Sequence, residues 1–417
     1  MIVSVRGYGL TAMGTVALVL LMSPAASALD RCRARPAPDG TIQVSATNVT
    51  GTPRWGTRWG MESTAFYDVE GCLSSGTMRN CPLAPPGAPE RTEAPAACAV
   101  YLRDDGENRC AAWVKGCQPS SEPLPCSILP PDNIWNRDVS ALPVHPMSTT
   151  WIQAIGADEP LKPDFGAGLY HRRAIGMPYV VIGPAQPLVP ITFRYASESD
   201  PGPYPIPPLV PIEGGGIRPS RGKGDAHILL VQAETCLLWE IFAARSLQRG
   251  ALWQGGSGAA FDLASNALRP DGWTSADAAG LPILPGLIRY DEVLAGAIMH
   301  AVRFTAPMTQ RAYVWPARHY ASASTDPNLP PMGIRVRLRA SFDISSFSPR
   351  NRTILTALQR YGMMLADNGA AWFVSGAPDR RWDNEELREL RRVRGSDFEV
   401  VDVSSLMLDP DSGATRP

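Results

Sequence analysis

The sequence predicts a mainly β protein: a sandwich or jelly-roll-like main domain with a few short helices, preceded by a small disulfide-rich module. Many short apolar runs have the length of strands, and 41 prolines and 37 glycines favour turns and loops over long helices. The cysteines predict the small module, because seven of the eight lie before residue 127.

Residues 1–28 have the pattern of a signal peptide. Arg6 precedes the apolar run "LTAMGTVALVLLM", and Ala26-Ser27-Ala28 is a small-x-small cleavage site. The run is short for a bilayer span, although a retained membrane anchor is the alternative. We expect a secreted or periplasmic protein with no membrane span once the signal is removed.

Residues 29–118 form the predicted cysteine-rich module, with strands expected at 41–51 and 97–103. An even number of cysteines in an exported chain indicates disulfides. We expect three bridges among the first six cysteines and a fourth between Cys126 and Cys236. A zinc site is the alternative, but there is no C-x-x-C pair and no histidine before His145. Residues 119–131 are a Pro/Ser-rich linker.

Residues 132–408 form the predicted β-rich main domain, followed by a flexible tail at 409–417. We expect a helix at 148–157 capped by Ser148 or Thr149, and a second one that Ser348 caps, with Pro349 at its first position. The second helix should run through residue 367, and a short charged helix should cover 383–395. Apart from the hairpin at 224–242, the expected strands lie at 176–183, 188–196, 258–264, 299–306, 311–317, 334–342 and 370–376.

The stretch "GDAHILLVQAETCLLWEIF", residues 224–242, reads as a β-hairpin with ionisable residues among apolar ones. A turn at Ala233 and Glu234 would place His227 opposite Glu240, and Asp225 beside them on the same face. One interpretation is a structural His–Glu pair at the edge of a core. The other is a cleft in which a carboxylate sets the tautomer and basicity of the histidine.

The segment 258–305 is the second dense group of polar residues. Its part "TSADAAGLPILPG" suits an ordered loop on a β scaffold, where binding residues tend to lie. Asp277 is therefore a catalytic candidate, although it could simply satisfy backbone donors of the loop. His300 is either a catalytic residue or a core histidine. The candidates for substrate binding here are Trp273, Tyr290 and Arg303.

Residues 313–333 add Trp315 and His319 to the binding candidates. Aromatic rings near charged groups in a loop suit sugar binding, because sugars present apolar CH faces and hydroxyls. Ordinary packing at the base of a loop is the alternative for Trp315.

Composition and motifs exclude several functions. The net charge of −1 gives no global field that would attract nucleic acid. There is no G-x-S-x-G, H-E-x-x-H or Walker A motif, and we expect no cofactor.

From Asp132 to about Leu406 the chain resembles a group of exported bacterial proteins of uncharacterised activity. The resemblance rests on the G-D-x-H hairpin, "TSADAAGLPILPG" and the G-x-I-x-H-A strand at 296–301, together with "DNIWNRDVSALPVHP" and "YVWPARHYASAS". It implies export and one intact domain, and no activity. More loosely, the hairpin and the G-x-I-x-H-A strand are similar to β-sandwich, lectin-like or polysaccharide-processing proteins.

These observations lead to an exported carbohydrate-active enzyme acting on a polysaccharide or cell-envelope glycan. A hydrolase, which needs two carboxylates, is favoured over a lyase, which needs a base and cationic groups. The alternatives are a non-catalytic carbohydrate-binding or envelope protein and, less favoured, a metal site at Asp225, His227 and His300. The catalytic candidates are Asp225, His227, Glu240, Asp277 and His300. The substrate-binding candidates are Trp273, Tyr290, Arg303, Trp315 and His319.

Overall fold

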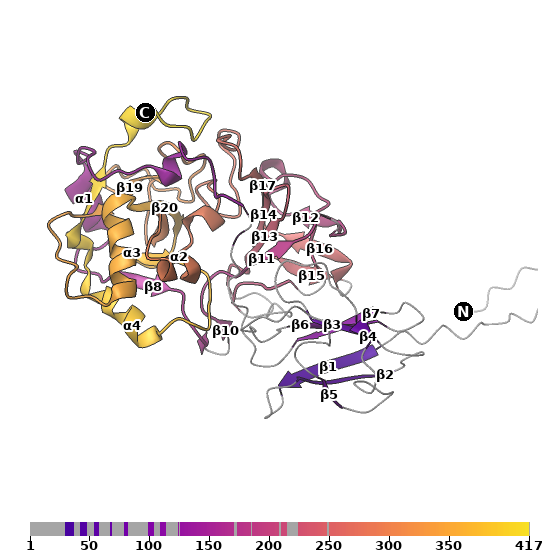
Figure 1. Ribbon diagram of the computed structural model, residues 1–417. Helices are drawn as coiled ribbons and strands as arrows, with labels where there is room; N and C mark the ends of the chain where they lie inside the picture. Colours follow the sequence, from indigo (N-terminus) through magenta and orange to yellow (C-terminus); the bar gives the residue numbers. More distant parts are fainter. Residues whose placement is uncertain are drawn as a thin grey trace, which may run out of the picture.

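The computed structural model describes strand segments within residues 30–113, and residues 124, 126–170, 173–184, 186–207, 210–214, 224–247 and 250–416 (Figure 1). The signal peptide expected at 1–28 and the side chains of the first six cysteines lie outside the described residues. Within them, no helix has the length and apolar character needed to cross a membrane.

The strands within residues 30–113 form two antiparallel sheets, in the orders β1-β2-β5 and β4-β3-β6-β7. Their bounds are β1 Asp30–Pro36, β2 Ile42–Thr47, β3 Arg54–Thr57, β4 Tyr67–Asp68, β5 Arg79–Cys81, β6 Ala99–Arg103 and β7 Arg109–Trp113. The strands expected at 41–51 and 97–103 are confirmed as β2 and β6.

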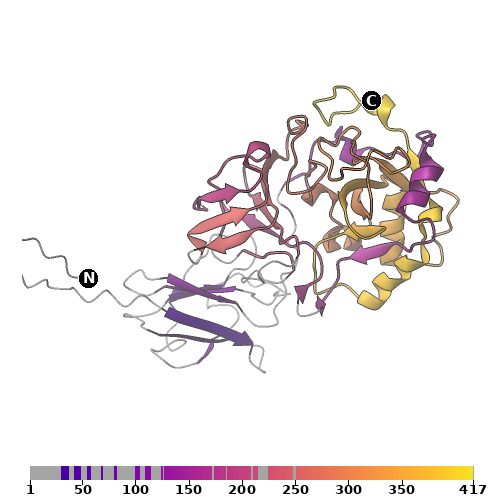
Figure 2. The ribbon, with the colours of Figure 1, turned by 180° about the vertical axis from the view of Figure 1, so that it is seen from behind.

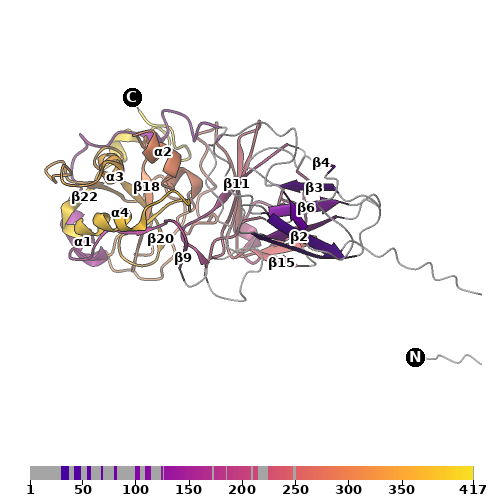
Figure 3. The ribbon, with the colours of Figure 1, turned by 60° about the horizontal axis from the view of Figure 1, so that its bottom comes forward.

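The largest sheet of the main part has six strands in the order β22-β19-β20-β18-β21-β8, with parallel and antiparallel pairs. Its strands are β8 Lys162–Asp164, β18 Val302–Ala306, β19 Arg335–Leu338, β20 Met363–Asn368, β21 Phe373–Ser375 and β22 Phe398–Val401. Helices α1 to α4 gather around this sheet (Figure 3).

A four-stranded sheet of order β11-β13-β14-β17 and a three-stranded sheet of order β12-β16-β15 form the other half, and Figure 2 shows both halves from behind. Here β11 pairs with β13, and β12 with β16, in parallel. The bounds are β11 Tyr179–Ile182, β12 Ile191–Phe193, β13 Ile228–Gln232, β14 Leu237–Ile241, β15 Arg245–Leu247, β16 Leu252–Gly255 and β17 Gly258–Asp262. A small ribbon pairs β9 (Leu169–Tyr170) with β10 (Arg173–Ala174).

The helices are short. The α-helices are α1 Ser148–Ile155, α2 Tyr290–Leu294, α3 Pro349–Arg360 and α4 Asn384–Arg388. The described 3₁₀ turns are η1 Ile134–Asn136, η2 Ala196–Glu198, η4 Leu284–Gly286, η5 Glu389–Arg392, η6 Gly395–Asp397 and η7 Ser404–Leu406.

The four-stranded sheet is buried on both faces. Leu229 and Val231 belong to the core that also contains the six-stranded sheet, whereas Ile228 and Leu230 belong to a second core with Trp253 of the three-stranded sheet. Apolar residues on both faces explain the unbroken run "HILLV". With 26% of residues in strands and 18% in helices, the mainly β class is confirmed.

Two expectations about local structure are wrong. The helix predicted through residue 367 ends at Arg360, because Gly362 has φ 67° and its position lies against the Val336 carbonyl, and β20 follows. Residues 311–317 are a turn with one isolated bridge at Tyr313, not a strand. Proline removes a ladder donor there, at Pro316.

The termini of the main part also correct the prediction. Residues 409–416 are tied to the start of the domain rather than flexible: Ile134 N–H donates to the Gly413 carbonyl at 2.8 Å, and Thr415 donates to Asp132. At α1, neither Ser148 nor Thr149 is the N-cap, since Met147 occupies it; the Ser148 hydroxyl instead accepts the Val400 N–H.

Cys126 and Cys236 form the expected disulfide, with Cα atoms 5.7 Å apart. The bridge closes a separation of 110 residues and fixes the segment before the domain to the turn of the hairpin.

Candidate functional site

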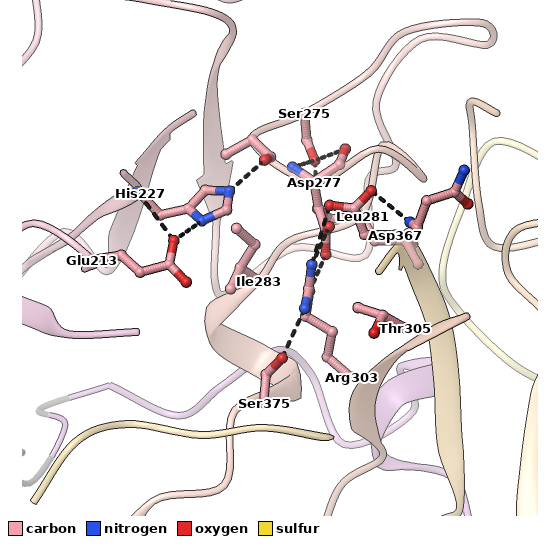
Figure 4. A network of polar contacts seen from close by, with 12 residues as sticks. Glu213, His227, Ser275, Asp277, Leu281, Ile283, Arg303, Thr305, Asp367 and Ser375 are labelled. Carbon is pink, nitrogen blue, oxygen red and sulfur yellow. Dashed lines mark hydrogen bonds and ion pairs between the residues drawn. The ribbon is translucent and has the colours of Figure 1, made fainter. Parts of the chain in front are cut away.

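The candidate site lies where the two halves of the main part meet. The segment 274–286, which we call the junction loop, hydrogen-bonds to both of them. His227, beside β13, contacts the Ala276 carbonyl, and Ala279 N–H donates to the Ala366 carbonyl of β20 at 2.9 Å. The side chains of this network are drawn in Figure 4.

The hairpin places His227 and Glu240 on the same face, as predicted, but in a different register. Leu229, not His227, is opposite Glu240, because the turn spans four residues, 233–236, with positive φ at Glu234 and Cys236. The pairing therefore slips by two residues, which preserves the face of each side chain. His227 is instead beside Phe242, with ring centroids 5.7 Å apart.

Both ring nitrogens of His227 are occupied, and the ring is buried. Nε2 donates to the Ala276 carbonyl at 3.0 Å, while Nδ1 lies 2.5 Å from Glu213 Oε2. A carbonyl and a carboxylate both accept, so the ring is an imidazolium that donates from both nitrogens. Burial opposes this charge, but the Glu213 carboxylate outweighs it and raises the pKa of His227 to about 9. His227 has no free nitrogen for catalysis and holds the junction loop in place.

Glu240 is fully buried and also structural. Its carboxylate accepts the N–H groups of Ile283 and Leu284 at 2.9–3.0 Å, where η4 begins. Burial raises the pKa of Glu240 to about 7, although the two backbone donors act in the opposite direction. Glu240 therefore supplies the acceptor for two N–H groups at the start of η4 that would otherwise have no partner.

We expect Glu240→Ala to destabilise the protein by about 2–4 kcal/mol, because two buried N–H groups lose their acceptor. Glu240→Gln keeps an oxygen acceptor and should cost much less. Urea unfolding of both variants at pH 7 checks this. Equal losses in the two variants would show that the charge, rather than the acceptor, is what the site requires.

Asp277 and Arg303 form a buried bidentate ion pair at the centre of the network (Figure 4). Arg303 Nε and Nη2 donate to the two Asp277 oxygens at 2.5 and 2.7 Å, and Nη1 donates to Ser375 Oγ at 2.7 Å. Burial opposes the charge of Arg303, but Asp277 outweighs it and raises the pKa of the guanidinium. Both residues were sequence candidates, and here they neutralise each other.

A β-bulge brings Asp367 onto the same sheet face as Arg303. Phe304 is the partner of Leu365, yet Thr305 is the partner of Asp367, so β20 holds one extra residue, Ala366. Without it, the alternation would turn Asp367 to the other face. Its Oδ2 lies 3.5 Å from Arg303 Nη2, and 23% of the side chain is exposed.

Asp367 differs from the other acids of the network in being both reachable by solvent and protonated near neutrality. Desolvation, and then the Asp277 carboxylate, raise the pKa of Asp367 to about 7, which the Arg303 charge only partly offsets. An acid that keeps its proton near neutral pH can act as a proton donor.

Asp164 and Asp225 are the exposed carboxyl groups around the network. Asp164 ends β8 as the register partner of Ser375. The pKa of Asp164 is raised, first by desolvation and then by Glu213, with Asp225 adding to the effect. Asp164 is therefore partly exposed, yet surrounded by enough protein atoms to be desolvated. The sequence candidate Asp225 lies close enough to Asp164 for its charge to raise that pKa further.

The sequence candidates His300 and Tyr290 belong to a different cluster. His300 Nε2 lies 3.1 Å from Arg289 Nη2 and 3.3 Å from Glu292, and its Nδ1 bonds the Ala301 carbonyl. Tyr290 is buried edge-on against Trp382, with centroids 4.8 Å apart. The structure does not bring these two into contact with the junction network, so we do not assign them to the site.

Trp273, Trp315 and His319 lie on loops near the junction loop. The Arg269 guanidinium covers the Trp273 ring at 5.5 Å, and Trp315 Nε1 donates to the Ser412 carbonyl at 2.8 Å. Trp315 is therefore engaged in packing the C-terminal segment. His319 bonds the Ala278 carbonyl and keeps its other nitrogen accessible.

Sequence reasoning missed Asp164, Glu213, Asp367 and Ser375. Glu213 lies in a Pro/Gly-rich loop that offers no periodicity, and Asp367 was placed at the end of a helix. Gly362 was the signal that could have revealed β20, since glycine after a helix commonly ends it. The bulge itself has no signature in this sequence.

Among the described residues, no three His, Cys, Asp or Glu side chains are grouped as a metal site would require. No protein-family model, curated protein or solved structure matches the chain.

Proposed function

We propose that the protein is an exported polysaccharide hydrolase that works at the junction network. The observation that supports this is Asp367: a solvent-accessible carboxyl with a pKa of about 7, beside a buried ion pair that fixes its surroundings. Asp367 is the proposed general acid, which protonates the oxygen of the leaving sugar.

A glycoside hydrolase also requires a second, ionised carboxylate. Asp225 and Asp164 are the accessible candidates, since Glu213, Glu240 and Asp277 are engaged by His227, by backbone N–H groups and by Arg303. Of the two, we propose Asp225, because desolvation raises the pKa of Asp164 and so disfavours the ionised form that this role requires of Asp164.

The lyase alternative has less support. It needs a free base and a cation to neutralise a uronate carboxylate, and the sequence offered His227, His300, Tyr290 and Arg303 for these roles. His227 and Arg303 are saturated by carboxylates, His300 is enclosed by Arg289 and Glu292, and Tyr290 is packed on Trp382.

The test is incubation of the purified protein with a polysaccharide panel, with assays for new reducing ends and for unsaturated products. On any hydrolysed substrate, Asp367→Asn should lower kcat by about 100-fold or more, because general acid catalysis contributes about 10²–10⁴-fold. The basic limb of the pH profile near pH 7 should disappear as well.

Glu385→Gln is the matched control, because this exposed acid of α4 pairs only with Arg388 at the surface. It should leave the rate unchanged. Unsaturated products would contradict hydrolysis, and binding of a glycan without any product would favour the non-catalytic alternative.

A further inference from the structure

His319 and Glu198 form a second pair of accessible titratable groups, outside the junction network. Glu198 ends η2, and its Oε2 lies 3.4 Å from the Thr274 N–H. His319 contacts the junction loop at another residue, because its Nδ1 bonds the Ala278 carbonyl. Both residues therefore contact the junction loop, but neither contacts Arg303 or Asp367.

The tautomer of His319 follows from its contact with Ala278. Nδ1 lies 2.9 Å from the Ala278 carbonyl, which can only accept, so Nδ1 carries the proton. In the neutral ring, Nε2 is then an acceptor with its lone pair exposed. This is the reverse of His227, in which both nitrogens are saturated.

Nε2 of His319 faces Glu198 across a gap that no direct hydrogen bond closes. The distance to Glu198 Oε2 is 3.6 Å, and the side chains are 25% and 34% exposed. Two acceptors side by side leave room for a donor, and a hydroxyl group or a water molecule can bond to either.

An aromatic stack adjoins this pair and holds the imidazole in position. The Tyr320 ring is parallel to His319, with centroids 5.3 Å apart and an angle of 4°, and Tyr313 stacks beyond it at 6.4 Å. Arg311 donates to the Tyr320 hydroxyl, and Asp271 accepts from the Tyr313 hydroxyl at 2.8 Å. The rings are partly exposed, as in surfaces that bind sugars.

We propose that Glu198 and His319 form a saccharide-binding subsite in which a sugar hydroxyl donates to one of the two acceptors, beside the Tyr320–Tyr313 stack. The ligand class is an uncharged oligosaccharide, because the Glu198 carboxylate and the Nε2 lone pair of His319 both accept hydrogen bonds and would repel the carboxylate of an acidic sugar. This inference rests on the proposed function for its ligand class, but it concerns binding rather than cleavage.

The experiment is calorimetric titration of the full-length protein with neutral hexasaccharides of the cello, xylo, manno and malto series. Glu198→Gln and His319→Phe should each weaken binding of the recognised hexasaccharide by at least 10-fold. Phenylalanine keeps the ring that stacks on Tyr320 but removes the Nε2 acceptor. Glu385→Gln should bind like the wild type, and thermal unfolding should show that all variants fold.

The outcomes separate this subsite from the proposed catalysis. Asp367→Asn should lower kcat by about 100-fold or more while binding persists, whereas the subsite variants should lose affinity first. Unchanged affinity in both subsite variants, or no binding of any of the four series, would overturn the subsite. A His319 Nε2 that NMR shows protonated at pH 7.5 would also overturn it, because the pair would then be a closed ion pair.

Discussion

Replacement of Asp277 by alanine is expected to lower the free energy of unfolding by about 3–5 kcal/mol, the cost of leaving one member of a buried ion pair without its partner. Arg303 would keep only the Ser375 hydroxyl and a 3.5 Å contact to Asp367. Urea unfolding at pH 7 measures the loss. The pKa of Asp367 should also fall, since the Asp277 carboxylate helps to raise it.

Two controls separate charge from packing. The double variant Asp277→Leu with Arg303→Met removes both charges, and it should recover most of the stability because no charge is left buried alone. Glu385→Ala breaks an ion pair whose side chains are 75% and 62% exposed, and it should cost little. If Asp277→Ala costs no more than Glu385→Ala, the pair does not hold the junction together.

The sequence was informative wherever alternation or apolar runs carry the structure. It predicted the hairpin, β11, β12, β17, β18, β19 and β21, the start of α3, and the Cys126–Cys236 bridge. These depend on local patterns of period two or 3.6, or on a count of cysteines. The face shared by His227 and Glu240 could also be predicted, because a two-residue slip does not alter it.

The function of each residue at the site could not be predicted, because it depends on long-range partners. His227 is saturated by Glu213 and by a carbonyl of the junction loop, 49 residues away along the chain. Asp367 reaches the site only through a bulge, and Asp164 only because β8 pairs with β21 in parallel. No local periodicity in the sequence encodes such pairings.

The second large effect is expected on stability at alkaline pH. The pKa of His227 rises from 6.5 to about 9 in the folded protein, so its ion pair with Glu213 stabilises the fold fully below pH 6.5 and is lost as the pH rises through 9. The loss should be on the order of 3 kcal/mol, since one unit of pKa corresponds to about 1.4 kcal/mol. His227 lowers the pKa of Glu213 although burial acts in the opposite direction. The stability that the ionised Glu213 contributes is therefore lost only when the pH falls below 4.5.

Between pH 7.5 and 9.5, the change in stability should come from His227, because the two acids with strongly raised pKa values titrate near pH 7. Asp367 and Glu240 have raised pKa values, so folding favours their protonated forms. The stability that these forms contribute falls as the pH rises from 3.8 for Asp367, and from 4.5 for Glu240, to about 7. The urea midpoint of the wild type should therefore drop across pH 7.5–9.5. Glu213→Gln keeps a hydrogen-bond acceptor without the charge, and its midpoint should be lower at pH 7.5 and nearly constant over this interval. Parallel curves for the two proteins would show that His227 is not an imidazolium, and its role in fixing the junction loop would have to rest on packing alone.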